Sequence, residues 1–170
     1  IETNKEAKRA VLRLDAATSE VSLAYMTGDF ETAIRKVKEI LSQDGLPPQF
    51  RNVLQSYLIR SVVLSHPELS REELEEMIGE LTITDPTLAE KTKKMSVALY
   101  DLTIAHESND YFETLTNEFK YPQLEIIYYK ALNAAIKGDT NRARELLRQL
   151  AGEDERLYVV RMGKNLLENN

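Results

Sequence analysis

The stretch that decides the fold is the ten-residue run Tyr25-Met26-Thr27-Gly28-Asp29-Phe30-Glu31-Thr32-Ala33-Ile34. Gly28 ends a helical run, and glycine readily adopts the positive φ that a tight helix exit requires. Asp29 is placed to cap the next helix, because its carboxylate can accept hydrogen bonds from the free N–H groups of the first turn. Ala33 is small and lies one turn further on, so it lets the second helix approach the first closely. The run therefore predicts a helix–turn–helix hairpin.

The same pattern occurs twice more in the chain. A close copy is Lys137-Gly138-Asp139-Thr140-Asn141-Arg142-Ala143-Arg144, and a looser copy with Asn in place of Gly is Ser108-Asn109-Asp110-Tyr111-Phe112-Glu113-Thr114-Leu115. We therefore expect one hairpin design to be repeated along the chain.

Periodic apolar residues and capping signals predict helices through most of the sequence. Ser70-Arg71-Glu72-Glu73 is a capping-box pattern, and Asp85-Pro86 combines a capping acid with proline at the first helical position. No segment shows sustained alternation of period two, so the predicted fold class is all-α. The predicted helices span 3–27, 30–43, 48–65, 71–81, 86–107, 110–119, 121–137, 139–151 and 153–168. In the first of them a single apolar stripe is formed by Ala7, Ala10, Val11, Leu14, Ala17, Val21 and Ala24.

Composition limits the classes of function. The 170 residues suffice for one core, so a single domain over 1–170 is expected, and 42% hydrophobic with 29% charged residues is typical of a soluble globular chain. A net charge of -6 argues mildly against nucleic-acid binding, which needs clustered Lys and Arg. The absence of cysteine excludes disulfides and zinc–thiolate sites. No apolar run reaches the roughly 18 residues of a membrane span, and no secretory signal is present. We expect a cytoplasmic location, although the chain begins at Ile1 and a signal, anchor or further domain could have been removed.

The hairpin pattern resembles the tetratricopeptide repeat, in which small residues lie where two helices meet and a Gly-Asp-aromatic turn joins them. The first pair matches at Ala24, Gly28, Asp29, Phe30, Glu31, Ala33, Val37 and Ile40, and the last at Ala131, Ala134, Gly138, Asp139, Ala143, Leu147 and Leu150. The second pair lacks the turn, and the family's Trp is absent. The resemblance implies an α-α superhelix of about four antiparallel helix pairs plus a C-terminal capping helix. A compact helical bundle is the alternative.

Motifs for catalysis are absent from the sequence. It contains no glycine-rich phosphate loop, no His-Glu-x-x-His and no Gly-x-Ser-x-Gly. The two histidines, His66 and His106, are interpreted as structural polar residues. The acidic run from Glu68 to Glu80 is interpreted as a solvated face, with a docking surface for a basic partner as the alternative. We predict no catalytic residue, no metal site and no cofactor, and we do not expect an enzyme.

The resemblance instead implies protein binding in a concave groove lined by the inner helices. Tyrosine suits such a groove because it combines a large apolar face with a hydrogen-bonding tip, although core packing would also explain each single tyrosine. We expect a non-enzymatic adaptor, chaperone-like or scaffold module that binds a peptide segment or helix of another protein, apolar or mildly basic in character. The alternative is a ligand-sensing or oligomerisation domain of a larger, bacterial-type regulator, and homo-oligomerisation is left open. The predicted partner-binding residues are Ser22, Tyr25, Tyr100, Thr103 and Tyr128.

Overall fold

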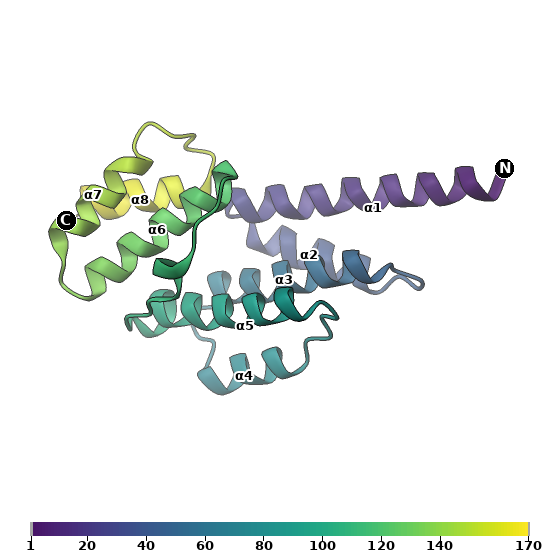
Figure 1. Cartoon of the computed structure of the whole chain (residues 1–170), viewed down its shortest axis with the longest axis horizontal. Coiled ribbons are helices and arrows are strands. Elements are labelled where there is room, and N and C mark those ends of the chain that lie inside the picture. Colours follow the sequence, from purple (N-terminus) through teal and green to yellow (C-terminus); the bar gives the residue numbers. More distant parts are fainter. Residues whose placement is uncertain (1, 170) are drawn as a thin grey trace.

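The computed structural model describes residues 2–169 and is all-α over that range, without a strand, as predicted. A π-helical turn at Asp101–Ala105 and a 3₁₀ turn at Tyr111–Thr114 lie between the fifth and sixth helices. The α-helices are α1 Glu2–Thr27, α2 Phe30–Leu41, α3 Pro48–Ser65, α4 Arg71–Gly79, α5 Pro86–Tyr100, α6 Lys120–Ile136, α7 Thr140–Leu150 and α8 Tyr158–Glu168 (Figure 1).

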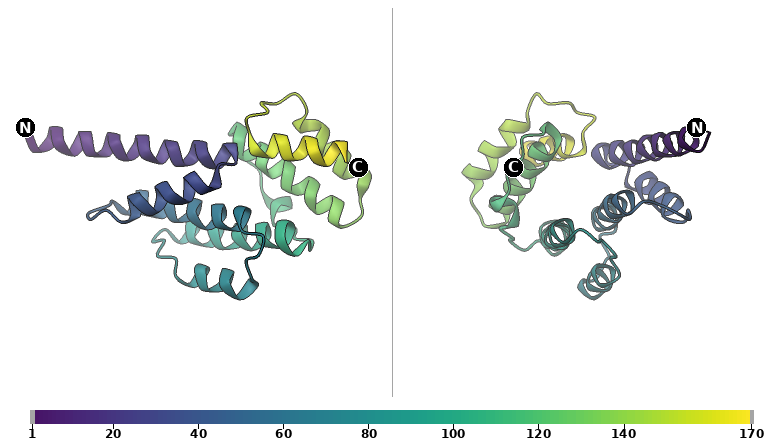
Figure 2. Two further views of the ribbon diagram at one scale, coloured as in Figure 1. Left: turned by 180° about the vertical axis from the view of Figure 1, so that it is seen from behind. Right: turned by 45° about the vertical axis from the view of Figure 1, so that its right-hand side comes forward.

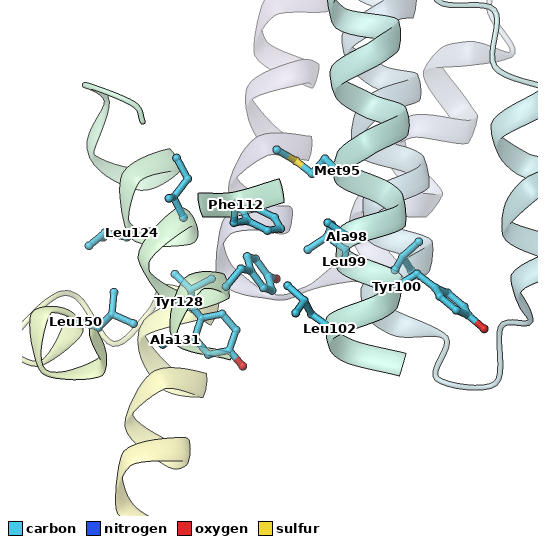
Figure 3. Packing of buried hydrophobic residues seen from close by; sticks show 14 of the residues in the cluster. Met95, Ala98, Leu99, Tyr100, Leu102, Phe112, Leu124, Tyr128, Ala131 and Leu150 are labelled. Atoms are coloured by element: carbon cyan, nitrogen blue, oxygen red, sulfur yellow. The ribbon is translucent and has the colours of Figure 1, made fainter. Parts of the chain in front are cut away.

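The helices form two groups that meet in the middle of the molecule. Helix α3 packs against α1, α2 and α5, whereas α6 packs against α7 and α8 (Figure 1). The larger hydrophobic cluster joins α3, α4 and α5 to α6, α7 and α8, and the smaller cluster joins α1, α2 and α3. Figure 3 shows Phe112 of the 3₁₀ turn between α5 and α6, where it is fully buried. One apolar cluster therefore joins the two groups, and the π-helical and 3₁₀ turns each contact both α5 and α6.

The two predicted Gly-Asp turns have the same geometry. Gly28 has a φ of 83° and Gly138 a φ of 84°. The backbone N–H groups of Asp29 and Asp139 each donate to the carbonyl five residues earlier, at 2.8 and 2.9 Å. Each Asp carboxylate accepts from the backbone N–H three residues later, at 3.3 and 3.1 Å. The hairpins α1/α2 and α6/α7 thus confirm the local predictions.

Other capping and packing predictions are also confirmed. Ala33 and Ala143 are buried, as expected of small residues at a helix contact. Ser70 and Glu73 form both hydrogen bonds of a capping box, each at 3.1 Å. The Asp85 carboxylate caps α5 by accepting from two backbone N–H groups. These signals work because each needs only residues within one turn.

The prediction of a helix over 110–119 is wrong, and the helix predicted over 86–107 is shorter. Helix α5 ends at Tyr100 and continues for one π-helical turn, after which His106 adopts a left-handed conformation with a φ of 55°. Only the single 3₁₀ turn follows before α6 begins. The third predicted hairpin is therefore not formed.

Side chains from distant positions hold this segment out of a helix. The backbone N–H of Asn109 donates to Asn133 at 3.0 Å, and the Asn109 amide donates to Asp101 at 2.8 Å. Further on, the backbone N–H of Asn117 donates to the Gln123 side chain at 3.1 Å. Asparagine and aspartate side chains compete in this way with the backbone bonds that a helix needs.

Two helix boundaries also differ from the prediction. Helix α4 ends at Gly79, and the following backbone N–H groups of Thr82 and Thr84 donate to side-chain amides of α3 at 2.7 and 3.1 Å. Helix α8 begins at Tyr158 and not at residue 153, because the Asp154 carboxylate accepts from the Arg156 backbone N–H at 2.9 Å and closes a turn there.

The apolar stripe of α1 is packed along only part of its length. Leu14, Ala17, Val21 and Ala24 lie against α2 and α3, but Val11 is 45% exposed. The reason is length, since the 12 residues of α2 span about 18 Å and the 26 residues of α1 about 39 Å. Figure 2 shows from two further sides that the first half of α1 projects from the other helices. The stripe is therefore packed against other helices only from Leu14 onward.

Gly163 is a contact point between α8 and α7. Glycine inside a helix is usually less stable than alanine by about 1 kcal/mol, so the sequence alone would predict that Gly163→Ala stabilises the protein. A Cβ atom there would, however, lie 2.7 Å from Leu150 Cδ1 in the buried core. Because overpacking costs about 1–3 kcal/mol, we expect Gly163→Ala to destabilise.

Within the described range, no helix has the length and apolar character needed to cross a membrane.

Candidate functional site

The candidate site is a cavity of about 310 Å³ where the two helix groups meet. Its walls come from the C-terminal part of α1, from α3, from α5 and from the first turns of α6, with residues 115–117 at one side. Polar groups and apolar groups both line it. Residues more than 100 positions apart in the sequence therefore converge on one space, from Ser22 to Ile126.

Arg60 is the cationic centre of the cavity. Its guanidinium carbon lies 4.8 Å from the ring centres of both Tyr25 and Tyr57, and its Nε donates to the Ser56 carbonyl at 3.1 Å. Two aromatic faces and one backbone acceptor thus fix the guanidinium group. Among residues 2–169, no carboxylate lies within 4.0 Å of it.

Glu125 on α6 supplies a buried carboxyl group. Glu125 is only 6% exposed, and its carboxyl group accepts a hydrogen bond from the Tyr25 hydroxyl at 2.9 Å. Burial raises the pKa of Glu125, opposed by the charges of Arg60 and Lys91 and by the bond from Tyr25. Within the described part of the chain no cation approaches within 4.0 Å of this carboxyl group, so its burial is only partly compensated.

Tyrosines form the rest of the polar wall. The rings of Tyr25 and Tyr57 meet edge to face at 5.4 Å, and the Tyr57 hydroxyl donates to Ser22 Oγ at 3.1 Å. Burial raises the pKa of Tyr25 and of Tyr121, and the nearby Glu125 raises both further. These phenols therefore stay neutral and act as hydrogen-bonding groups.

The predicted partner-binding residues fall into three places. Ser22 and Tyr25 line the cavity described above. Thr103 and Tyr128 line a second cavity of about 240 Å³ between α3, the π-helical turn, α6 and α8. Tyr100 lines neither, because its ring packs against Arg71 at 4.9 Å, and Figure 3 shows it pointing away from Tyr128. The structure thus brings Ser22 and Tyr25 together but separates them from the other three.

Sequence reasoning missed Arg60, Tyr57, Lys91 and Glu125 as site residues. A signal was available for two of them, because Arg60 and Glu125 are the single charges within mostly apolar helical segments, Tyr57–Leu64 and Leu124–Tyr129. Charged residues are rarely buried unless something pairs with them. Tyr57 and Lys91 carry no such signal.

Of the two Gly-Asp turns, only the first lies beside the cavity, since Tyr25 and Met26 of α1 line it. The two hairpins share the geometry of their turns, which neighbouring residues determine. The cavity instead depends on residues from four helices. Comparisons of the chain with protein-family models, with curated proteins and with solved structures found no match.

Proposed function

We propose that this chain is a non-enzymatic, tetratricopeptide-like interaction module that binds a short segment of a partner protein in the α1–α3–α5–α6 cavity. The observation that carries the proposal is the pair Arg60 and Glu125, which line the same cavity without forming an ion pair. Glu125 accepts one hydrogen bond from Tyr25, and Arg60 donates its Nε to the Ser56 carbonyl, so both side chains keep further bonding capacity for an occupant.

The size of the cavity limits the occupant. At about 310 Å³ it lies at the lower end of ligand pockets, which run from about 300 to 1,000 Å³. A helix is about 10 Å across and does not fit, whereas one or two residues of an extended segment do. Of the two partner types expected from the sequence, the proposal therefore retains the peptide segment. A cytoplasmic location and homo-oligomerisation stay predictions.

Blocking the cavity at its exposed side tests the proposal. Thr116 is exposed and lines the cavity, and Thr114 is exposed on the same segment without lining it. We expect Thr116→Trp to abolish capture of a partner from a cell extract, while Thr114→Trp leaves it unchanged, with both compared by quantitative mass spectrometry. A set of captured proteins that is the same for both variants would contradict the proposal.

A second candidate function is small-molecule sensing, which the enclosed position of the cavity between four helices favours. Native mass spectrometry of the purified protein tests it, since a bound small molecule adds its own mass. The retained mass should be absent from Thr116→Trp and present in Thr114→Trp.

A further inference from the structure

We infer that the bound segment is a free amino terminus, whose α-ammonium group binds Glu125 and whose first carbonyl oxygen accepts from Arg60. This inference rests on the proposed function and names the chemistry of the partner. It starts from Glu125, a carboxyl group with one hydrogen bond, no cation within 4.0 Å among residues 2–169, and a place in the cavity wall.

Glu125 lacks a cation in direct contact among residues 2–169, because Arg60 and Lys91 act on its carboxyl group only from beyond 4.0 Å. A buried carboxylate is costly unless a positive charge and further hydrogen bonds compensate it. Arg60 does not supply this contact, because the Tyr25 and Tyr57 rings and the Ser56 carbonyl fix its guanidinium elsewhere. Aromatic faces around the carboxyl group also attract a cation. An ammonium group entering the cavity would therefore meet a carboxylate and several tyrosines together.

The neighbouring Arg60 distinguishes the sources of such an ammonium group. At an amino terminus the first carbonyl oxygen lies three bonds from the ammonium nitrogen, so one residue can bind Glu125 and Arg60 together. A lysine side chain brings the ammonium group without an acceptor beside it. A carboxy terminus would suit Arg60 but would place a second carboxylate near Glu125, which like charges disfavour. The opposite charges of the cavity therefore fit an amino terminus best.

The rest of the cavity fits the first side chain of such a segment. Apolar groups of Met26, Met95 and Ile126 line the wall beside the charged pair. An apolar first residue would bury its side chain there and gain hydrophobic free energy. The remainder of the segment would leave the cavity past the exposed residue Thr116.

The pH dependence of binding distinguishes an amino terminus from a lysine side chain as the bound group. An α-amino group has an ordinary pKa of about 7.7–8.0, and lysine of about 10.4. The groups that face Glu125 are Tyr25 from α1, Arg60 and Tyr57 from α3, Lys91 from α5 and Tyr121 from α6. Burial raises the pKa of Tyr25 and of Tyr121, so these two phenols stay neutral between pH 7 and 9. Binding should therefore weaken between pH 7 and 9 as the α-ammonium group loses its proton.

The test uses the full chain and a randomised library of tetrapeptide amides, half with a free amino terminus and half acetylated. Retained peptides are measured by affinity selection and mass spectrometry at pH 7 and pH 9. We expect free-amine peptides with apolar first residues to be retained about thirtyfold or more above their acetylated counterparts, the loss that follows when a buried charge is left unpaired. Glu125→Gln should abolish this preference, and Glu75→Gln on the exposed face of α4 should not. Circular dichroism checks the fold of both variants.

Several results would overturn the inference. These are equal retention of free and acetylated peptides, retention of no peptide, retention that depends on internal lysine and persists at pH 9, or free leucine binding as tightly as the peptides. The proposed function has a separate test, because Thr116→Trp can still block partner capture when acetylation has no effect. In that case the segment-binding proposal stands and the amino-terminal inference fails.

Discussion

The Gly28 and Gly138 turns are built alike but lie in different surroundings. A Cβ atom at Gly28 would lie 2.8 Å from Tyr158 Cδ2 of α8, whereas nothing lies within 4 Å of the same position at Gly138. Arg161 of α8 also donates to the Thr27 carbonyl beside the first turn, at 2.7 Å. One local pattern therefore encodes both turns, and only the first of them joins the beginning of the fold to its last helix.

Alanine at the two glycines should separate the local effect from the tertiary one. Gly138→Ala should lose about 1–2 kcal/mol of unfolding free energy, the cost of a left-handed conformation with a Cβ atom. Gly28→Ala should lose about 2–5 kcal/mol, because overpacking against Tyr158 adds about 1–3 kcal/mol. Urea denaturation of both variants measures the difference. Equal losses would show that the contact with α8 contributes nothing to stability.

Enlarging the small residue inside each hairpin should give more similar effects. Ala33→Leu and Ala143→Leu should each cost about 1–3 kcal/mol, since both positions are buried where paired helices meet. The cost should be larger at Ala33, which is fully buried, than at Ala143, which is 5% exposed. Thermal unfolding reports both. If a substitution leaves the melting temperature unchanged, the alanine it replaces does not lie at the contact between the paired helices.

The capping aspartates should behave as equals. Asp29→Ala and Asp139→Ala each remove one exposed side-chain bond of the same type and should each cost about 1 kcal/mol. Because both carboxylates are exposed, tertiary surroundings should not distinguish them. Chemical denaturation of both variants on the same day gives the required precision. If the two losses of unfolding free energy differ by more than about 1 kcal/mol, tertiary contacts affect the capping aspartate as well as the glycine.

Glu125 of the second hairpin is buried against Tyr25 of the first, and this burial should make the stability of the fold depend on pH. Burial raises the pKa of Glu125 above the unfolded value of about 4.3, so the stabilising contribution of its protonated form is fully present below about pH 4. This contribution is lost as pH rises through the raised pKa. The glutamine side chain of Glu125→Gln does not ionise, so it makes no such pH-dependent contribution. The variant should therefore become more stable relative to the parent chain as pH rises. Urea denaturation between pH 4 and 8 follows the two chains, and parallel profiles would contradict the assignment.

The sequence predicted those parts of the fold that depend on neighbouring residues. Asp29 and Asp139 cap as expected, and Ser70 with Glu73 forms the predicted capping box. The segment around Asn109 was predicted wrongly, because its bonds come from residues as distant as Asn133. Local propensity carries no information about such partners.

The candidate site was harder to predict for the same reason. Ser22 and Tyr25 were expected to bind a partner and do line the cavity, but their neighbours Arg60 and Glu125 lie on two other helices. No short motif connects positions that are separated by so much chain. Tyr100 lies apart from Ser22 and Tyr25 for a different reason, because the sequence placed it on a shared groove by assuming a regular superhelix, and the third hairpin of that arrangement is not formed.

The unequal lengths of α1 and α2 have a consequence for hydrogen exchange. The side chains of residues 3–13 of α1 are exposed, and isolated helices of this length are marginally stable in water. Their amides should exchange with deuterium in a gradient from the first turn inward, by local fraying that leaves the rest folded. Protection should rise sharply at Leu14 and reach the level of global unfolding by Val21. The first helix of this protein is thus divided into a part that opens alone and a part that opens only when the whole chain unfolds.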